Sequence, residues 1–335
     1  MGNKDLLIFN ESGIYCPIAD VYLDPWRKVD TCIISHAHSD HSRFGMKKYY
    51  THHHSLPIMK LRLGENINVK GLEYGEELNI KGVKFSLHPA GHLIGSAQVR
   101  VQHEDDVWVY SGDYKLENDN VAAPFEAIKC NTFITECTFG LPIFNWSPQN
   151  EIFDEMQKWI LDNHKKGLTS VILAYSLGKA QRIINNLNLE KFNINTFTHY
   201  SVENINQIYR ENSIQIKPTY LINKDTDASN IKGNLVIAPP AVLESAWLKK
   251  LQPYKTAMAS GWMNLKGAKR RRNVDKGFVI SDHADWKDLL KAIHLTGAER
   301  IITTHGYTRT FSKYLNQVGY KAFIENTEFS AEGVE

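Results

Sequence analysis

Three histidines and one aspartate crowd into a single short stretch of this sequence, Ser35-His36-Ala37-His38-Ser39-Asp40-His41. Neutral imidazoles and carboxylates are the ligands that zinc-type cations take in proteins. The stretch directly follows an apolar, β-branched run, so we expect a strand end, a tight turn and a helix start. Such a turn can direct His36 and His38 at one ion, and Asp40 and His41 at another. The spacing therefore predicts a metal centre with room for two ions.

Further candidate ligands lie downstream, each just after an apolar run: His92, Asp113 and, near the end of the chain, His305. Taken singly, such a histidine is more often a hydrogen-bonded core residue, and a Gly-Asp pair is more often a turn. The dense cluster upstream favours the interpretation of these residues as metal ligands. Asp24 likewise stands at the end of an earlier apolar run.

The elements that must position these residues alternate along the chain. Short apolar, β-branched runs predict strands over residues 31–34, 83–87, 107–110, 132–135, 170–174, 235–238, 278–280 and 300–303. Helical spacing recurs over residues 151–164, 179–187, 243–251 and 286–295. This alternation predicts an α/β architecture, in which chemically active residues follow the carboxyl ends of strands.

The candidate residues form two groups, from 24 to 136 and from 282 to 305, with an ordinary strand and helix alternation between them. If both groups make one site, the middle is an insertion into a domain that closes around it. We expect a first domain part over residues 1–148, an inserted domain over 149–265, and a second part over 266–335 that completes the site.

These motifs carry a family resemblance. The pattern HxHxDH, followed by Gly-His and Ser-Gly-Asp, resembles the metallo-β-lactamase fold. Residues 135–140, 281–285 and 304–306 resemble motifs A, B and C of the β-CASP nucleases. Residues 176–181 and 260–263 are similar to segments of bacterial ligase-associated DNA exonucleases. The resemblance implies an αββα four-layer metallo-β-lactamase sandwich with an inserted α/β β-CASP domain.

The resemblance also implies a ligand set. His36, His38 and His92 would hold one ion, Asp40, His41 and His305 the other, and Asp113 would bridge them. Asp24 would orient a liganding histidine rather than bind metal itself. The nitrogen-rich set favours two zinc ions, with manganese as the alternative. A histidine at the position of His305 is more typical of the RNA-processing branch than of DNA nucleases.

The implied chemistry is hydrolysis of a phosphodiester. Two ions about 3.5–4 Å apart lower the pKa of a bridging water, and the resulting hydroxide attacks phosphorus in line with the leaving group. Asp40 and Asp113 serve this step as ligands. His283 would protonate the departing oxygen, because imidazole titrates near neutrality, and Glu136 would hold and polarise that ring.

Two segments are candidates for binding substrate. The run Lys269, Arg270, Arg271 and Arg272 packs four cations together and could neutralise phosphates, although a charge run is more often a solvated face. Ser176, Gly178 and Lys179 lie at an expected strand-to-helix turn and could present amides and an ammonium to a terminal phosphate. We interpret His52, His53 and His54 as a polar turn before a helix, rather than as a metal site.

Composition supports a soluble globular protein: 42% of residues are hydrophobic and 23% charged, which excludes disordered and fibrous classes. The net charge of +2 predicts no polyanion partner by itself. The four cysteines form no CxxC pair, and the apolar run Leu6–Phe9 is too short for a leader or a span. We expect a cytoplasmic protein without a membrane partner.

The leading hypothesis is a metal-dependent DNA exonuclease in repair, working beside an ATP-dependent DNA ligase and a helicase as the resemblance suggests. A β-CASP ribonuclease of RNA processing is the near alternative, because it shares every catalytic residue. A small-molecule hydrolase of the metallo-β-lactamase type is the second alternative, but the insertion and His283 would then have no task.

Overall fold

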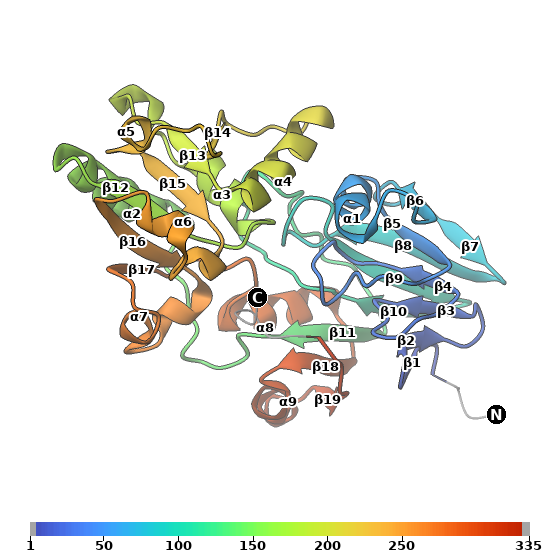
Figure 1. Cartoon of the computed structure of the whole chain (residues 1–335). Helices are drawn as coiled ribbons and strands as arrows, with labels where there is room; N and C mark the ends of the chain where they lie inside the picture. The colour runs from blue at the N-terminus through green and yellow to red at the C-terminus, as the bar shows by residue number, and fades with distance from the viewer. Residues whose placement is uncertain (1–4, 330–335) are drawn as a thin grey trace. The chain divides into compact units, whose positions relative to one another are not determined.

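The structure is a computed structural model that describes residues 5–329 (Figure 1). The chain forms two compact units. Unit 1 comprises the residues up to 118, residues 122–145 and the residues from 283 onward, and unit 2 comprises residues 119–121 and 146–282. The second junction therefore lies at 282/283 rather than at the expected 265. The reason is that the segment after 265 supplies an edge strand to the sheet of unit 2.

The first sheet of unit 1 has the order β1-β2-β3-β4-β5-β6. Its strands are β1 (Ile8–Asn10), β2 (Gly13–Cys16), β3 (Val21–Leu23), β4 (Thr31–Ile33), β5 (Lys48–His52) and β6 (Val69–Leu72). β1 to β3 pair antiparallel, and β3 to β6 pair parallel. Parallel neighbours need a crossover connection, and α1 (Ser55–Leu63) provides it between β5 and β6.

The second sheet of unit 1 has the order β19-β18-β11-β10-β9-β8-β7. Its strands are β7 (Leu78–Ile80), β8 (Val83–Pro89), β9 (Ala97–His103), β10 (Asp106–Tyr110), β11 (Thr132–Cys137), β18 (Arg300–Gly306) and β19 (Lys321–Ile324). The apolar side chains of Ile33 in the first sheet and Val99 in the second belong to one core cluster. A separate cluster joins this second sheet to α8 (Trp286–Thr296) and α9 (Thr308–Gln317).

Unit 2 is built on one parallel sheet of order β14-β13-β15-β12-β16-β17. Its strands are β12 (Thr169–Leu173), β13 (Thr196–Thr198), β14 (Tyr220–Leu221), β15 (Leu235–Ala238), β16 (Tyr254–Ala259) and β17 (Lys276–Phe278). Two successive residues of β12, Val171 and Ile172, belong to two different core clusters, so both faces of the sheet are covered. Burial on both faces explains why the strands β12 and β15 are buried throughout and rich in apolar residues.

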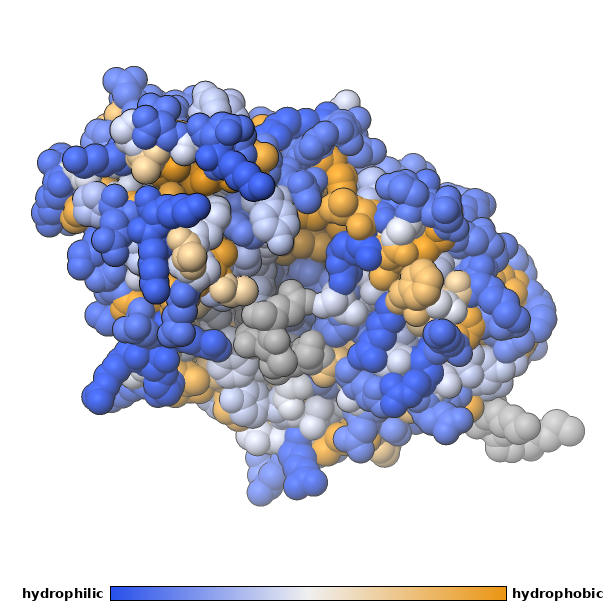
Figure 2. Space-filling model, viewed as in Figure 1, coloured by the Kyte–Doolittle hydropathy of each residue, from blue (hydrophilic) through white to orange (hydrophobic). Residues whose placement is uncertain are grey.

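Helices cover the sheet of unit 2 and connect its strands. They are α2 (Gln149–Lys165), α3 (Lys179–Asn186), α4 (Tyr200–Glu211), α5 (Ala228–Ile231), α6 (Ala246–Lys249) and α7 (Ala268–Arg271), with 3-10 turns η1 (Glu190–Phe192), η2 (Pro240–Val242) and η3 (Gly261–Asn264). Between residues 5 and 329, every helix is too short or too polar to cross a membrane. Hydrophilic side chains cover most of the face shown in Figure 2.

Candidate metal centre

The candidate ligands of unit 1 lie on loops that leave neighbouring strands. His36, His38, Asp40 and His41 follow β4, His92 follows β8, and Asp113 follows β10. His305 lies within β18, one residue before its end. The side chains are largely withdrawn from water, since His36 and His92 are fully buried and Asp113 is 4% exposed. Strand ends from both sheets of unit 1 therefore meet at one buried polar cluster.

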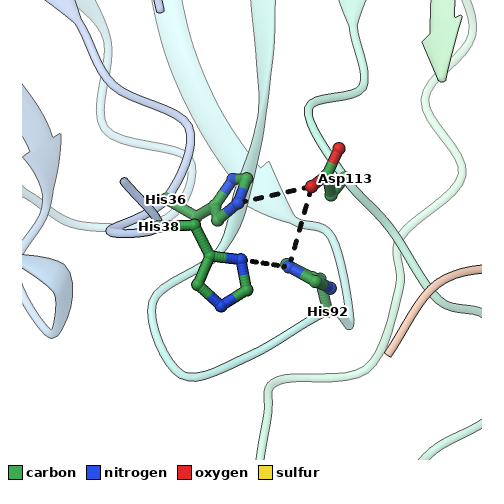
Figure 3. A group of neighbouring side chains, drawn as sticks. All are labelled: His36, His38, His92 and Asp113. Carbon is green, nitrogen blue, oxygen red and sulfur yellow. Dashed lines mark hydrogen bonds and ion pairs between the residues drawn. The ribbon is translucent and has the colours of Figure 1, made fainter. Parts of the chain in front are cut away.

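One carboxylate oxygen, Oδ2 of Asp113, is the focus of this cluster (Figure 3). It lies 3.5 Å from Nε2 of His36, 3.4 Å from Nε2 of His41 and 3.9 Å from Nε2 of His92. Nδ1 of His38 lies 3.1 Å from Nε2 of His92. Ligand atoms of His36, His38, His92 and Asp113 all fall within 4.8 Å of one another. Such spacing is suited to a cation, which would draw these atoms together.

The second set of candidate ligands is adjacent. Oδ2 of Asp40 lies 3.7 Å from Nε2 of His41. His305 is not within the four-residue group, but its charge contributes to lowering the pKa of Asp40, a carboxyl whose burial alone would raise it. His305 adopts a left-handed backbone conformation with φ of 49° and is 8% exposed. His305 therefore lies near enough to Asp40 to influence its charge, and the ligand role that the resemblance implies for His305 stays a prediction.

Hydrogen bonds at Nδ1 of His36 and at Nδ1 of His41 determine which ring nitrogen is available to bind a metal ion. Asp24 is fully buried, and its Oδ2 lies 2.7 Å from Nδ1 of His41. The hydroxyl of Ser35 donates to Asp24 and lies 2.9 Å from Nδ1 of His36, so it accepts a hydrogen bond from that ring. Both histidines thus carry their proton on Nδ1 when neutral, which leaves the Nε2 lone pair facing the cluster.

Three inward-facing atoms of the cluster make no hydrogen bond among residues 5–329. Nε2 of His36, Nε2 of His41 and Oδ1 of Asp113 are buried and make no hydrogen bond there. Buried polar atoms without partners are costly and rare, and a bound cation explains three of them at once. This observation supports a metal ion as the group that these residues fit.

The charges of the cluster follow from its burial. Burial lowers the pKa of His36 well below its usual value, and the charge of His41 adds to this effect. Burial would likewise lower the pKa of His41, but the charges of Asp113 and Asp40 raise it well above its usual value. Burial would raise the pKa of Asp113, but His41 and His283 lower it well below its usual range. The carboxylate therefore stays ionised, and a metal ion would displace the proton of His41.

A second carboxylate–imidazole pair lies beside the cluster. Nδ1 of His283 lies 2.9 Å from Oε2 of Glu136 on β11, and both residues are at least 95% buried. Glu136 is itself held by the backbone amide of Tyr114 at 2.9 Å and by the hydroxyl of Thr138. The ring centroids of His283 and His92 are 4.8 Å apart. His283 is thus oriented next to the candidate ligands.

Gly112 allows the chain to pass this close to the ligands. Its φ of 54° is left-handed, and a Cβ atom would lie 2.8 Å from both Cβ and Oγ of Ser35. Ser35 is the residue that orients His36 and contacts Asp24. The Ser-Gly-Asp order therefore places Asp113 against the first loop because its central residue has no side chain.

Phe329 is a site residue that the sequence did not indicate. Its ring stacks on His41, with centroids 4.2 Å apart and an interplanar angle of 13°. The preceding residue, Glu328, pairs with Arg27, and its carbonyl oxygen accepts a hydrogen bond from Arg43. A lone phenylalanine far from every motif has no spacing signal, so only the fold could reveal this contact.

The candidate substrate residues of unit 2 divide into two kinds. Lys179 is fully buried, with its Nζ 3.6 Å from Oδ2 of Asp282 and 4.6 Å from the centroid of Tyr175. The amide of Gly178 donates to Gln181 at 2.8 Å, and the hydroxyl of Ser176 lies 2.9 Å from that of Ser201. These three residues are therefore engaged within unit 2.

The basic run is different, because it lies on the surface. Lys269, Arg270 and Arg271 belong to the single turn of α7, Arg272 follows it, and all four are exposed. Figure 2 shows hydrophilic side chains over the region of α7. These four cations are accessible to a polyanion.

Comparison with known proteins finds similarity over nearly the whole chain. The sequence is 30% identical over 323 residues to a "Probable DNA ligase" of Opitutus terrae, covering 93% of this chain and 30% of that protein. It is 24% identical over 181 residues to an "RNase J-like protein" of Methanocaldococcus jannaschii, covering 47% and 43% of the two chains. This chain spans less than half the length of either relative.

Two further comparisons concern protein-family models and solved structures. No model of a known protein family matches the sequence. A crystal structure of a protein of unknown function from Enterococcus faecalis V583 matches the fold with a TM-score of 0.62 at 13% identity, covering 89% of this chain and 80% of that one. The fold is therefore one that a solved structure shares, from the first unit through the second.

Proposed function

We propose that this protein is a metal-dependent nuclease of the metallo-β-lactamase and β-CASP type. The observation that carries the proposal is the convergence of His36, His41 and Asp113, whose inward-facing atoms are buried without hydrogen-bond partners in residues 5–329. The similarity to an RNase J-like protein supports a phosphodiester as the bond cleaved. The core clusters on both faces of the second sheet support the αββα layering.

The proposed centre holds two divalent ions, which we take to be zinc with manganese as the alternative. His36, His38 and His92 would hold one ion, Asp40, His41 and His305 the other, with Asp113 between them. The position of Oδ2 of Asp113 within 3.9 Å of three Nε2 atoms supports the bridging role. When bound, two such ions supply positive charge that polarises phosphoryl oxygens and lowers the pKa of water.

The residues of the chain would handle the leaving group. His283 has its Nδ1 fixed by Glu136, so its Nε2 is the nitrogen that can hold a proton for a departing sugar oxygen. Glu136 accepts a hydrogen bond from Nδ1 of the ring and keeps the ring from rotating, because its own oxygens are held by Tyr114 and Thr138. We assign His283 as the general acid and Glu136 as its positioning residue.

The finer proposal is a DNA exonuclease that trims ends before sealing. The similar segment makes up 30% of a protein named "Probable DNA ligase", which supports work beside an ATP-dependent ligase. A ribonuclease of RNA processing is the second candidate, and the RNase J-like match over 47% of the chain favours it. Because the DNA exonuclease and the ribonuclease would use the same metal centre, only the preference for DNA or RNA as substrate distinguishes the two candidate functions.

A time course on end-labelled single-stranded DNA and RNA of equal sequence tests this function, with zinc or manganese supplied. Stepwise shortening of DNA is expected, and Asp113→Ala should show none. Preferential cutting of RNA would move the protein to the RNA-processing branch. If neither polymer is cut, the nuclease proposal fails and a small-molecule hydrolase takes its place.

Two substitutions separate the metal centre from the proposed acid. Asp113→Ala should abolish cleavage and release metal, because it removes the carboxylate shared by the ligands. His283→Ala should reduce kcat by roughly 10²–10⁴-fold, the usual worth of a general acid, while bound metal measured by elemental analysis is unchanged. Equal loss of metal in both variants would contradict the assignment of His283.

The exposed basic turn is proposed to bind the nucleic-acid backbone. Replacing Arg270, Arg271 and Arg272 together with Gln should weaken binding of single-stranded DNA and flatten its salt dependence by about 0.7 in log–log slope per lost phosphate contact. The matched control replaces the exposed Lys165, Lys166 and Lys232 of unit 2 with Gln. Equal slopes for the two triple variants would remove α7 from the binding surface.

A further inference from the structure

The loop that follows the candidate ligands carries an exposed aromatic ring. Phe44 comes three residues after His41 and is 68% exposed, more than any other large hydrophobic side chain in residues 5–329. By contrast, Ser42 and Met46 in the same loop are buried. A stretch of three residues spans at most about 11 Å, so the backbone of Phe44 lies close to that of a candidate ligand.

The backbone on either side of Phe44 is fixed by one buried hydroxyl. The side chain of Tyr49 donates to the carbonyl oxygen of Arg43 at 2.9 Å and accepts a hydrogen bond from the backbone amide of Met46 at 3.0 Å. Between these two points Gly45 has φ of 108°, a conformation that other residues rarely adopt. The loop therefore presents Phe44 outward on an ordered backbone.

The same loop is attached to the segment of candidate ligands. The amide of Ser42 donates to the carbonyl oxygen of His38 at 2.8 Å, and its hydroxyl donates to the same oxygen at 2.9 Å. Nε of Arg43 donates to the carbonyl oxygen of Asp40 at 3.3 Å. A group that binds to this loop is therefore held beside the metal centre.

A cation lies against the loop. A Cβ atom at Gly45 would lie 2.8–3.2 Å from three carbon atoms of the Lys28 side chain, so the stem of Lys28 packs on the loop. Lys28 is exposed and forms no ion pair among residues 5–329. The nearby Lys47, by contrast, pairs with Asp30 at 2.8 Å. The ammonium of Lys28 is therefore available to an anion.

We propose that Phe44 and Lys28 bind one nucleotide of a single-stranded nucleic acid, with its base stacked on the ring and a phosphate beside the ammonium. This binding site rests on the proposed nuclease function of the neighbouring centre. Every base has a π-face, so the ring accepts DNA and RNA alike. An aromatic side chain on an ordered loop is already in place for stacking, which reduces the entropy lost on binding.

Fluorescence anisotropy of labelled single-stranded DNA and RNA of equal sequence tests the stacking role. A chelator is present, so that neither polymer is cut. Phe44→Ala should bind both polymers about 5- to 150-fold more weakly, the usual worth of one stacked base. Phe44→Leu should be as weak as Phe44→Ala, because it keeps the apolar character and loses the π-face. Phe44→Trp should bind at least as tightly as the unmodified chain.

A matched control and two contrary outcomes make this measurement decisive. Phe323→Ala removes another exposed ring, 49% exposed on β19, and should leave both affinities unchanged. Unchanged affinity in Phe44→Ala would overturn the proposal, and so would unchanged affinity in Phe44→Leu. A loss confined to one polymer would assign the binding site to that polymer.

The salt dependence of binding separates the two residues. Lys28→Gln should lower the log–log slope by about 0.7, because one phosphate contact is lost. Phe44→Ala should leave the slope unchanged, because stacking releases no counterions. Lys321→Gln, which removes an exposed cation of β19, should not change the slope. Equal slopes for Lys28→Gln and the unmodified chain would remove Lys28 from the binding site.

Metal content and kinetics distinguish this binding site from the centre itself. Phe44→Ala should hold as much zinc as the unmodified chain by elemental analysis, and loss of zinc would overturn the proposal. With zinc supplied, Phe44→Ala should raise KM at unchanged kcat, as removal of uniform binding does. If the unmodified chain binds both polymers and cuts neither, the nuclease function fails while the binding comparison still decides the role of Phe44.

Discussion

Asp24 orients residues of the candidate metal centre, although it is not itself one of the proposed metal ligands. It is fully buried and accepts hydrogen bonds from the amide and hydroxyl of Ser35, from the hydroxyl of Tyr110 and from the ring of His41. Its negative charge keeps the proton of His41 on Nδ1. The orientation of His41 therefore depends on this single carboxylate. The orientation of His36 depends on it as well, through Ser35.

Asp24→Asn isolates this effect. Asparagine tolerates the left-handed conformation that Asp24 adopts, with φ of 41°, so the backbone is expected to be unchanged. Metal affinity should fall by roughly 10–100-fold, as for other partners that orient liganding histidines. Competition with a chromophoric chelator measures it. Tyr110→Phe, which removes one donor to the same carboxylate, should lose less; an equal or larger loss would show that Asp24 acts through something other than His41.

Most candidate residues of the centre were predictable because their chemistry is local to the sequence. Four potential ligands within Ser35–His41 are improbable by chance, and His92 and Asp113 follow apolar runs that the structure shows as β8 and β10. Ser35 and Phe329 were not predictable. Neither has a spacing that marks it, and the role of each depends on a contact that only the folded chain creates.

At the scale of elements, the loop after β10 shows how closely the chain must approach the loop after β4. Gly112 has φ of 54° and would place a Cβ atom 2.8 Å from Ser35, whereas Gly75 has φ of 78° and nothing within 4 Å. Both glycines have a left-handed backbone conformation, so an alanine would be strained at either position. Only Gly112 adds a collision with the group that orients His36.

The pair Gly112→Ala and Gly75→Ala separates strain from collision. Each alanine should cost about 1–3 kcal/mol in free energy of unfolding from its backbone conformation. Gly112→Ala should cost more and should also weaken metal binding, since Ser35 must move. Chemical denaturation and metal titration measure the two effects. Equal losses of stability and unchanged metal affinity in both variants would show that Gly112 is needed for its backbone alone.

The periodic elements were predicted well where burial is uniform. The helix expected over 151–164 is α2 at Gln149–Lys165, and the strand expected over 235–238 is β15 with the same bounds. The helix expected over 243–251 is only one short turn, α6 at Ala246–Lys249. The first sheet of unit 1 was largely missed, because strands of three or four residues such as β1 and β3 carry too few apolar positions to show a period.

At the scale of the molecule, the candidate centre belongs wholly to unit 1, while unit 2 has its own core clusters. Metal binding should therefore stabilise unit 1 alone. At a free-ion concentration 100-fold above Kd the gain is about 2.7 kcal/mol, which raises Tm by roughly 5–10 °C.

Calorimetry with and without a chelator measures this difference. Chelation should lower the melting temperature of one transition, and hydrogen exchange should assign that transition to β4, β8 and β10. Asp113→Ala should already melt at the lower temperature and should not respond to chelator. A shift of equal size in the transition of β12 and β15 would show that the two units unfold as one.

The parallel pairing of β11 with β18 has a consequence for how the protein is made. The Cys137 thiol at the end of β11 donates to the carbonyl oxygen of His305, 168 residues further along the chain. Translation delivers the chain from its N-terminus at about 5–20 residues per second, so β11 emerges well before the strand that it needs. The contiguous segment 146–282 can fold during that delay. A nascent chain still lacking β18 has neither His305 nor the strand that flanks Glu136, so we expect the ribosome-bound protein to be inert until β18 has been made.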